Sequence, residues 1–152
     1  MADYAYTETI ARPPADVFAW LLDLERRYKW VPGLESAEAL TPVPLGAGGR
    51  WRERRRIGAR AGSGEVEVTT CEAPDEGRSP PFRVSLSRPA GRGRLTQHFV
   101  LQPDGDKATR IDLRGEVGGG LLGLFLARAL AREDADLLLR LKSAVETEGL
   151  WP

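Results

Sequence analysis

The fold is decided by the segment Ile10–Asp23, IARPPADVFAWLLD, together with Trp30–Gly33, WVPG. The side chains of residues 4–10, which precede the two prolines, follow the two-residue period of a β-strand. This pattern predicts an edge strand with Tyr4, Tyr6, Glu8 and Ile10 on one face. The prolines end that strand and favour the start of a helix of about ten residues. A short second helix is expected over 24–28, and Pro32-Gly33 ends it.

Six further strands are expected, over 34–41, 49–58, 63–72, 81–88, 92–102 and 108–117, and one long helix over 121–148. Asp104-Gly105 gives the strongest hairpin signal between two of these strands. A seven-stranded antiparallel sheet cannot bury its inner face alone, and only the last helix is long enough to cover it. The sequence therefore predicts a single α+β domain over residues 1–152. Its sheet curves around the C-terminal helix, and the two short helices close one end.

The composition and the missing motifs exclude several classes of partner and cofactor. The chain has 22 basic and 22 acidic residues, so no net charge draws it to nucleic acid or anionic lipid. A single cysteine, Cys71, excludes a disulfide framework and a thiolate metal cluster. Phosphate loops, dinucleotide fingerprints and metal-ligand clusters are missing, so no cofactor or metal is expected. Without a secretory signal or an apolar run long enough for a membrane span, we expect a cytoplasmic monomer or homodimer.

Four short motifs, spread in order along nearly the whole chain, resemble the SRPBCC (START-like) superfamily. They are IARPPADVF at Ile10–Phe18, Trp30 before Pro32-Gly33, GGRW at Gly48–Trp51 and ATRI at Ala108–Ile111. The most similar branch is that of the small bacterial polyketide cyclase/dehydrase-like proteins. The resemblance implies the helix-grip fold, a seven-stranded antiparallel sheet around a long C-terminal helix with an apolar cavity between them. It implies no single activity, because members range from lipid carriers to cyclases and chaperone activators.

Strand alternation divides the side chains of 49–58 between two faces of the sheet. One face carries four arginines that must be solvated, Arg50, Arg52, Arg54 and Arg56. Trp51, Glu53 and Arg55 therefore point inward. Glu65 and Glu67 on the next strand are expected to pair with the arginines, which neutralises the stripe and argues against nucleic-acid binding.

The candidate ligand-binding residues are the inward side chains of the sheet and the apolar first half of the last helix. They are Trp51, Glu53, Arg55, Val68, Phe82, Val84, Gln97, Phe99, Leu113, Leu122, Phe125 and Leu126. The helix segment either lines the cavity mouth or covers a buried helix end. Alternation also places Thr70 inward and the only histidine, His98, on the outer face. Trp30 is either an aromatic residue at the pocket edge or a plug for the corner between helix and sheet, and the plug is favoured.

Glu53, Arg55 and Gln97 are the polar exceptions on the inward face. Buried charges are costly unless paired, so Glu53 and Arg55 are expected to be joined by an ion pair or by a ligand group. They form either a structural pair or a site that orients a polar substituent of a hydrophobic ligand. Glu53 and Arg55 are also the candidate catalytic residues, as acid or base and as enolate stabiliser, with Gln97 as an orienting donor.

Three functions follow from this pattern. The leading one is intracellular binding of a small hydrophobic ligand, such as a lipid, polyketide or isoprenoid fragment, because the inner face is apolar and lacks a recognisable catalytic constellation. The second is a polyketide cyclase, aromatase or dehydrase that uses the same cavity. The third is a protein-interaction or chaperone-cofactor role for the arginine stripe.

Overall fold

The structure, a computed structural model, describes residues 2–57, 59–75 and 77–148. Its elements follow in the order β1 (Ala2–Ile10), α1 (Pro14–Leu21), α2 (Leu24–Arg27), β2 (Leu34–Ala39), β3 (Arg50–Ile57), β4 (Arg60–Glu72), β5 (Phe82–Ala90), β6 (Gly93–Pro103), β7 (Thr109–Val117) and α3 (Gly120–Thr147). Every element expected from the sequence is present, with bounds shifted by a few residues. Across the described residues, no helix has the length and apolar character that a membrane crossing requires.

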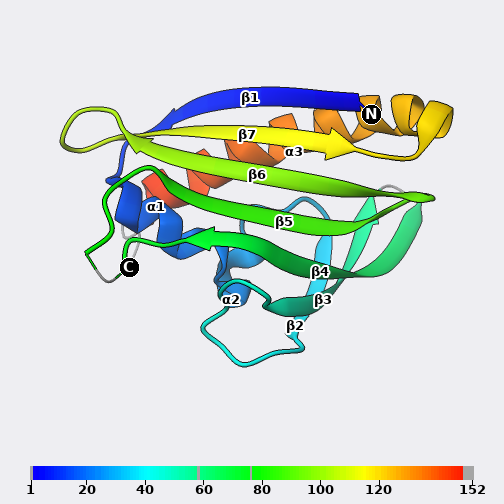
Figure 1. Cartoon of the computed structure of the whole chain (residues 1–152), viewed down its shortest axis with the longest axis horizontal. Helices are drawn as coiled ribbons and strands as arrows, with labels where there is room; N and C mark the ends of the chain where they lie inside the picture. The colour runs from blue at the N-terminus through cyan, green and yellow to red at the C-terminus, as the bar shows by residue number, and fades with distance from the viewer. Residues whose placement is uncertain (1, 58, 76, 149–152) are drawn as a thin grey trace.

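The seven strands form one antiparallel sheet in the order β1-β7-β6-β5-β4-β3-β2. Successive strands from β2 to β7 are neighbours, and β1 returns to pair with β7. The sheet curves, and α3 runs along its concave side, where it packs most extensively on β1 and β7 (Figure 1). This is the helix-grip fold, as expected from the sequence.

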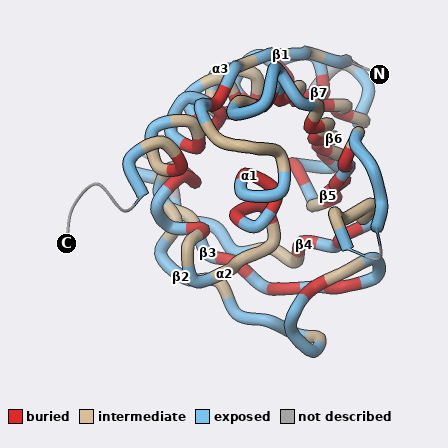
Figure 2. The backbone as a smooth tube through the Cα atoms, turned by 90° about the vertical axis from the view of Figure 1, so that its left-hand side faces the viewer, coloured by how far each residue is buried: buried red, intermediate tan, exposed pale blue. Residues whose placement is uncertain are grey.

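Helices α1 and α2 close one end of the curved sheet, and α1 lies inside the opening between the sheet and α3 (Figure 2). Pro14 occupies the first turn of α1, where a missing N–H costs nothing. One face of α1 is buried through Val17, Phe18, Trp20 and Leu21. Asp23 caps α2, because its side chain accepts a hydrogen bond from the N–H of Glu25 at 3.0 Å.

The core lies between the concave face of the sheet and the C-terminal half of α3. It is filled by large side chains that are almost fully buried, among them Trp20, Trp30, Trp51, Phe99, Leu101, Ile111, Leu113 and Leu138. Trp30 packs edge-on against Phe99, with ring centroids 6.4 Å apart. It fills the corner between α2 and the sheet, which is the plug expected of it.

A β-bulge in β4 overturns one expectation. The register between β4 and β5 shifts between Val68 and Thr70, so Val68 pairs with Leu86 but Thr70 pairs with Ser85. Because Ser85 lies on the outer face with His98, Thr70 also faces outward, and its expected inward orientation is wrong. The extra residue turns Cys71 toward the core instead.

The arginine stripe of β3 lies on the outer face, as alternation predicts. Arg50 forms an ion pair with Glu65 of β4 at 2.5 Å. Arg54 and Arg56 share Glu35 of β2, at 3.1 and 3.4 Å. The stripe is therefore part of a surface of mixed charge. This argues against the hypothesis that the arginines form a basic docking site for a partner.

Candidate functional site

A cavity of about 490 Å³ lies between the N-terminal half of α3 and strands β3, β4 and β5. Residues 61–64 of β4, Arg88 and Pro89 of β5 and the first half of α3 line it, and these segments lie at the end of the sheet away from α1 (Figure 1). The lining residues are Glu53, Arg55, Ala61, Gly62, Ser63, Gly64, Val66, Arg88, Pro89, Leu126, Ala129, Leu130 and Glu133. A volume of this size is typical of sites for small organic molecules.

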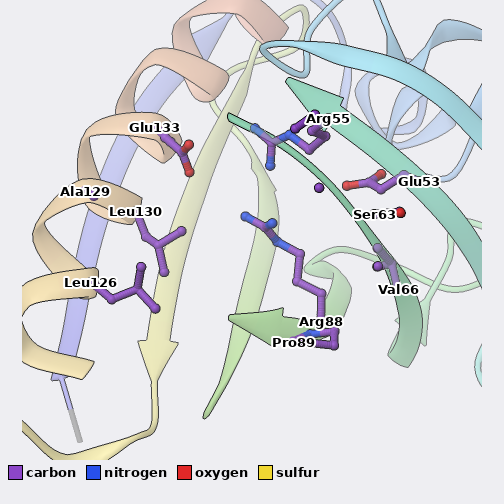
Figure 3. A pocket seen from close by; sticks show the side chains of 13 residues that line it. Glu53, Arg55, Ser63, Val66, Arg88, Pro89, Leu126, Ala129, Leu130 and Glu133 are labelled. Carbon is purple, nitrogen blue, oxygen red and sulfur yellow. The ribbon is translucent and has the colours of Figure 1, made fainter. Parts of the chain in front are cut away.

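Figure 3 shows the arrangement inside this cavity. Leu126 and Leu130 project from α3, and Val66 and Pro89 face them from β4 and β5. The guanidinium groups of Arg55 and Arg88 extend into the space between these walls, and the carboxylate of Glu133 points toward them from α3. The cavity thus combines apolar walls with a small charged cluster.

The two arginines carry hydrogen-bond donors without acceptors. Arg55 donates from Nε to the carbonyl oxygen of Pro32 at 3.2 Å. Its Nη2 atom and the Nη2 atom of Arg88 are both buried without a hydrogen-bond partner. Burial and the neighbouring charge of Arg88 lower the pKa of Arg55 from its usual value. A buried cation with an unused donor is costly, so the cluster favours an acceptor from outside the protein.

Glu53 forms its ion pair with Arg27 of α2, which corrects the expected pair with Arg55. Its Oε2 atom accepts hydrogen bonds from Nε of Arg27 at 2.8 Å and from Nε1 of Trp51 at 2.9 Å. Burial alone would raise the pKa of Glu53, but the charge of Arg27 and these hydrogen bonds outweigh it and lower the pKa to about 2. The Glu53 carboxylate is therefore ionised and weakly basic.

The Arg27 guanidinium also lies over two aromatic rings, 5.2 Å from the centroid of Trp30 and 4.9 Å from that of Trp51. Such cation–π contacts and the ion pair together compensate for burying the charge. Arg27 and Glu53 thereby join α2 to β3, and of the two only Glu53 lines the cavity.

A second buried carboxylate, Asp134, lies on α3 and joins this helix to two strands. It accepts hydrogen bonds from the Tyr4 hydroxyl of β1 at 2.5 Å and from the Gln97 amide of β6 at 2.8 Å. Burial raises the pKa of Asp134, and these two hydrogen bonds partly offset that effect. Gln97 is therefore occupied in fixing α3.

The structure brings together only some of the side chains proposed from the sequence. Glu53, Arg55 and Leu126 line the cavity. Seven others point inward as expected but are part of the packed interior and do not line the cavity: Trp51, Val68, Phe82, Val84, Gln97, Phe99 and Leu113. Phe125 is 76% exposed and faces away from the cavity. The side chain of Leu122 lies outside the described residues.

Sequence reasoning missed four charged residues of this region: Arg27, Arg88, Glu133 and Asp134. Three of them carried a signal. Arg88 continues the inward alternation of Val84 and Leu86, and Asp134 lies in the apolar stripe of α3 between Leu130 and Leu137. Glu133 follows the same helical spacing from Leu126 and Leu130.

His98 lies on the outer face of the sheet, as alternation predicts. Its Nδ1 atom is 2.8 Å from the Ser85 hydroxyl, and its Nε2 atom is 3.4 Å from a Glu116 carboxylate oxygen. This grouping resembles a hydrolase triad only in composition. Ser85 is 6% exposed, and the strands around it are paired in the sheet, so their N–H groups are not free to stabilise an oxyanion. Within the described residues, no group of three metal-ligating side chains occurs.

The family model described as polyketide cyclase / dehydrase and lipid transport matches residues 1–146. The chain belongs to this family. The match confirms the SRPBCC resemblance, and it places the protein among polyketide cyclase/dehydrase and lipid-transport proteins. None of the curated proteins compared with the chain matches it.

Solved structures share the fold of this family member. The Zhui aromatase/cyclase from Streptomyces sp. R1128 has a TM-score of 0.74 at 16% identity, covering 96% of this chain and 94% of its own. TTHA0849 from Thermus thermophilus has a TM-score of 0.69 at 22% identity, covering 97% and 99%. Ara h 8.0201 has a TM-score of 0.70 at 14% identity, covering 97% and 99%. Family and fold together indicate a protein that binds a hydrophobic ligand or acts as a polyketide cyclase or aromatase.

Proposed function

We propose that the protein binds a small, mainly apolar molecule in the cavity between α3 and strands β3–β5, without transforming it. The observation that carries this proposal is the combination of apolar walls with two inward arginines whose Nη2 donors lack a partner. A site of this kind gains affinity from apolar burial and orientation from a few polar groups. The lipid-transport part of the family description supports the same function.

The chemistry around Glu53 supports binding over catalysis. A general base or acid works best when its pKa lies near the operating pH. The pKa of Glu53 is lowered to about 2 by Arg27 and Trp51, so this carboxylate neither holds a proton to donate nor accepts one readily. Its role is to hold Arg27, and with it α2, against β3.

A neutral fluorescent dye, N-phenyl-1-naphthylamine, tests the proposal by titration into the protein. We expect saturable binding with enhanced, blue-shifted fluorescence, as the dye leaves water for the apolar walls. The variant Ala129→Trp projects a large ring from α3 at the cavity lining and should weaken binding by about tenfold or more. The matched control is Leu139→Trp, at a 53% exposed position of the same helix that does not line the cavity.

Saturable binding that Ala129→Trp reduces and Leu139→Trp leaves unchanged would support the proposal. Equal binding by both variants would place the dye elsewhere, and absence of saturable binding would contradict the function itself. Thermal unfolding of both variants, followed by circular dichroism, shows whether each variant is folded. Loss of binding can then be distinguished from loss of structure.

A second candidate is cyclase or aromatase chemistry, favoured by Glu133, whose carboxylate faces Arg55 and Arg88 across the cavity. There the arginines would stabilise an enolate, and Glu133 would serve as the base. The aromatase/cyclase likeness of the fold supports this reading. Incubation with a poly-β-ketone thioester tests it. Turnover that Glu133→Gln abolishes would favour the enzyme, and lack of turnover by the unaltered protein would contradict it.

A further inference from the structure

Two arginines in the charged cluster of the cavity carry hydrogen-bond donors that no protein group accepts. Arg55 and Arg88 extend their guanidinium groups into the same space, and each has a buried Nη2 atom without an acceptor. Neither arginine forms an ion pair with a residue that the structure describes. Two like charges that face the same space repel each other, so an anion bound between them stabilises the arrangement.

The nearby carboxylates are engaged elsewhere or stand across the cavity. The Oε2 atom of Glu53 is paired with Arg27 at 2.8 Å, while its Oε1 atom is buried without a hydrogen-bond partner. Each oxygen of Asp134 accepts a hydrogen bond, from Tyr4 or from Gln97. Glu133 alone faces the two arginines from α3. Glu53 is neutralised by Arg27, so Glu133 is the one lining carboxylate that faces the two arginines without an ion pair of its own. Asp134 lies outside the lining and acts on both arginines through its charge alone.

We infer that the polar group of the ligand is a carboxylate, bound between Arg55 and Arg88, with the apolar part of the molecule against Val66, Pro89, Leu126 and Leu130. A carboxylate presents two oxygens that match the donor geometry of guanidinium groups. Glu133 lies across the cavity from the two arginines and would repel a doubly charged phosphate more strongly than a singly charged carboxylate. The inference rests on the proposed binding function and narrows it to apolar carboxylic acids.

Competition between two ligands of equal chain length separates the charge from the apolar tail. Decanoic acid, which is ionised at neutral pH, and 1-decanol are each used to displace N-phenyl-1-naphthylamine from the protein. We expect decanoate to bind at least tenfold more tightly than decanol. Arg88→Met should weaken decanoate binding by about tenfold to hundredfold and leave decanol binding nearly unchanged. Arg55→Met gives a second, independent variant with the same expectation.

The matched control is Arg83→Met on the same strand as Arg88. Arg83 is exposed on the outer face and pairs with Glu72, so its removal should leave both affinities unchanged. Equal affinity of the unaltered protein for decanoate and decanol would overturn the inference while leaving the binding function intact. Equal losses for acid and alcohol in Arg88→Met would also overturn it. Failure of the dye and both ligands to bind would instead overturn the proposed function.

Discussion

Among single residues, the lining residue Glu53 is held in place by a buried ion pair with Arg27. The side chains of Arg27 and Glu53 are each only 4% exposed, and their nearest polar atoms lie 2.8 Å apart. Removing one partner of such a pair leaves an uncompensated buried charge, which typically costs about 3–5 kcal/mol. The pair therefore fixes α2 against β3 and keeps Arg27 out of the cavity, where Arg55 and Arg88 already lie.

The Glu53 carboxylate should make stability depend on acidity. Its pKa falls from 4.5 to about 2 on folding, so its contribution is complete above the unfolded value and is lost as pH falls from about 5 toward 2. The shift corresponds to about 3 kcal/mol. Urea denaturation at pH 6 and pH 3 should show a smaller drop in unfolding free energy for Glu53→Gln than for the unaltered protein. Equal drops would contradict the assigned ion pair.

The sequence is informative about side-chain direction but much less about partners. Alternation in β3 places Glu53 and Arg55 inward, which the structure confirms for Glu53, 4% exposed, and for the lining residue Arg55. Their pairing could not be predicted, because Arg27 comes from a four-residue helix that is too short to show a periodicity. Arg88 and Asp134 could have been found, since each is a charged residue at a position that the apolar pattern assigns to the interior.

At the scale of elements, the two halves of α3 have different tasks. The C-terminal half buries Leu137, Leu138, Leu141 and Val145 against the sheet. The N-terminal half stands over β3–β5 with Leu126 and Leu130 lining the cavity between them. Asp134 lies where the two halves meet, and its hydrogen bonds to Tyr4 and Gln97 tie the helix to β1 and β6 at that point.

Gly115 of β7 allows this tie, because the Tyr4 ring lies directly against its backbone. A Cβ atom at Gly115 would lie 2.2 Å from the Tyr4 ring. Gly115→Ala should therefore displace Tyr4 from Asp134 and lower the unfolding free energy in urea by about 1–3 kcal/mol. Gly62→Ala, at a strand glycine with open space around it, is the control. Equal stability of the two variants would show that the position of Tyr4 beside Asp134 does not depend on a glycine at position 115.

The elements themselves were accessible from the sequence, but a local irregularity was not. Strand alternation holds through Val66 and Val68, where each side chain is almost fully buried. The bulge after Val68 then exchanges the directions of Thr70 and Cys71. A bulge adds one residue without a strong sequence signature of its own, so a period-2 pattern continues past it and assigns the wrong face.

At the scale of the whole molecule, the fold separates a packed end from an open one. Helices α1 and α2 fill one end of the curved sheet, while the start of α3 lies over the other (Figures 1 and 2). Element order and the need to cover one sheet face were enough to predict this architecture. The position of the cavity could not be predicted, because it depends on which side chains pack closely and which leave space under α3.

The space under α3 is the proposed binding site for an apolar molecule. Methyl chemical-shift mapping of ¹³C-labelled protein, titrated with N-phenyl-1-naphthylamine, tests it directly. We predict that the methyl signals of Val66, Leu126 and Leu130 shift in a saturable manner, while those of Ile111 and Leu113, packed elsewhere in the core, change little. Shifts confined to Val100 on the outer face, or no saturable shift at all, would show that the space under α3 is not the binding site.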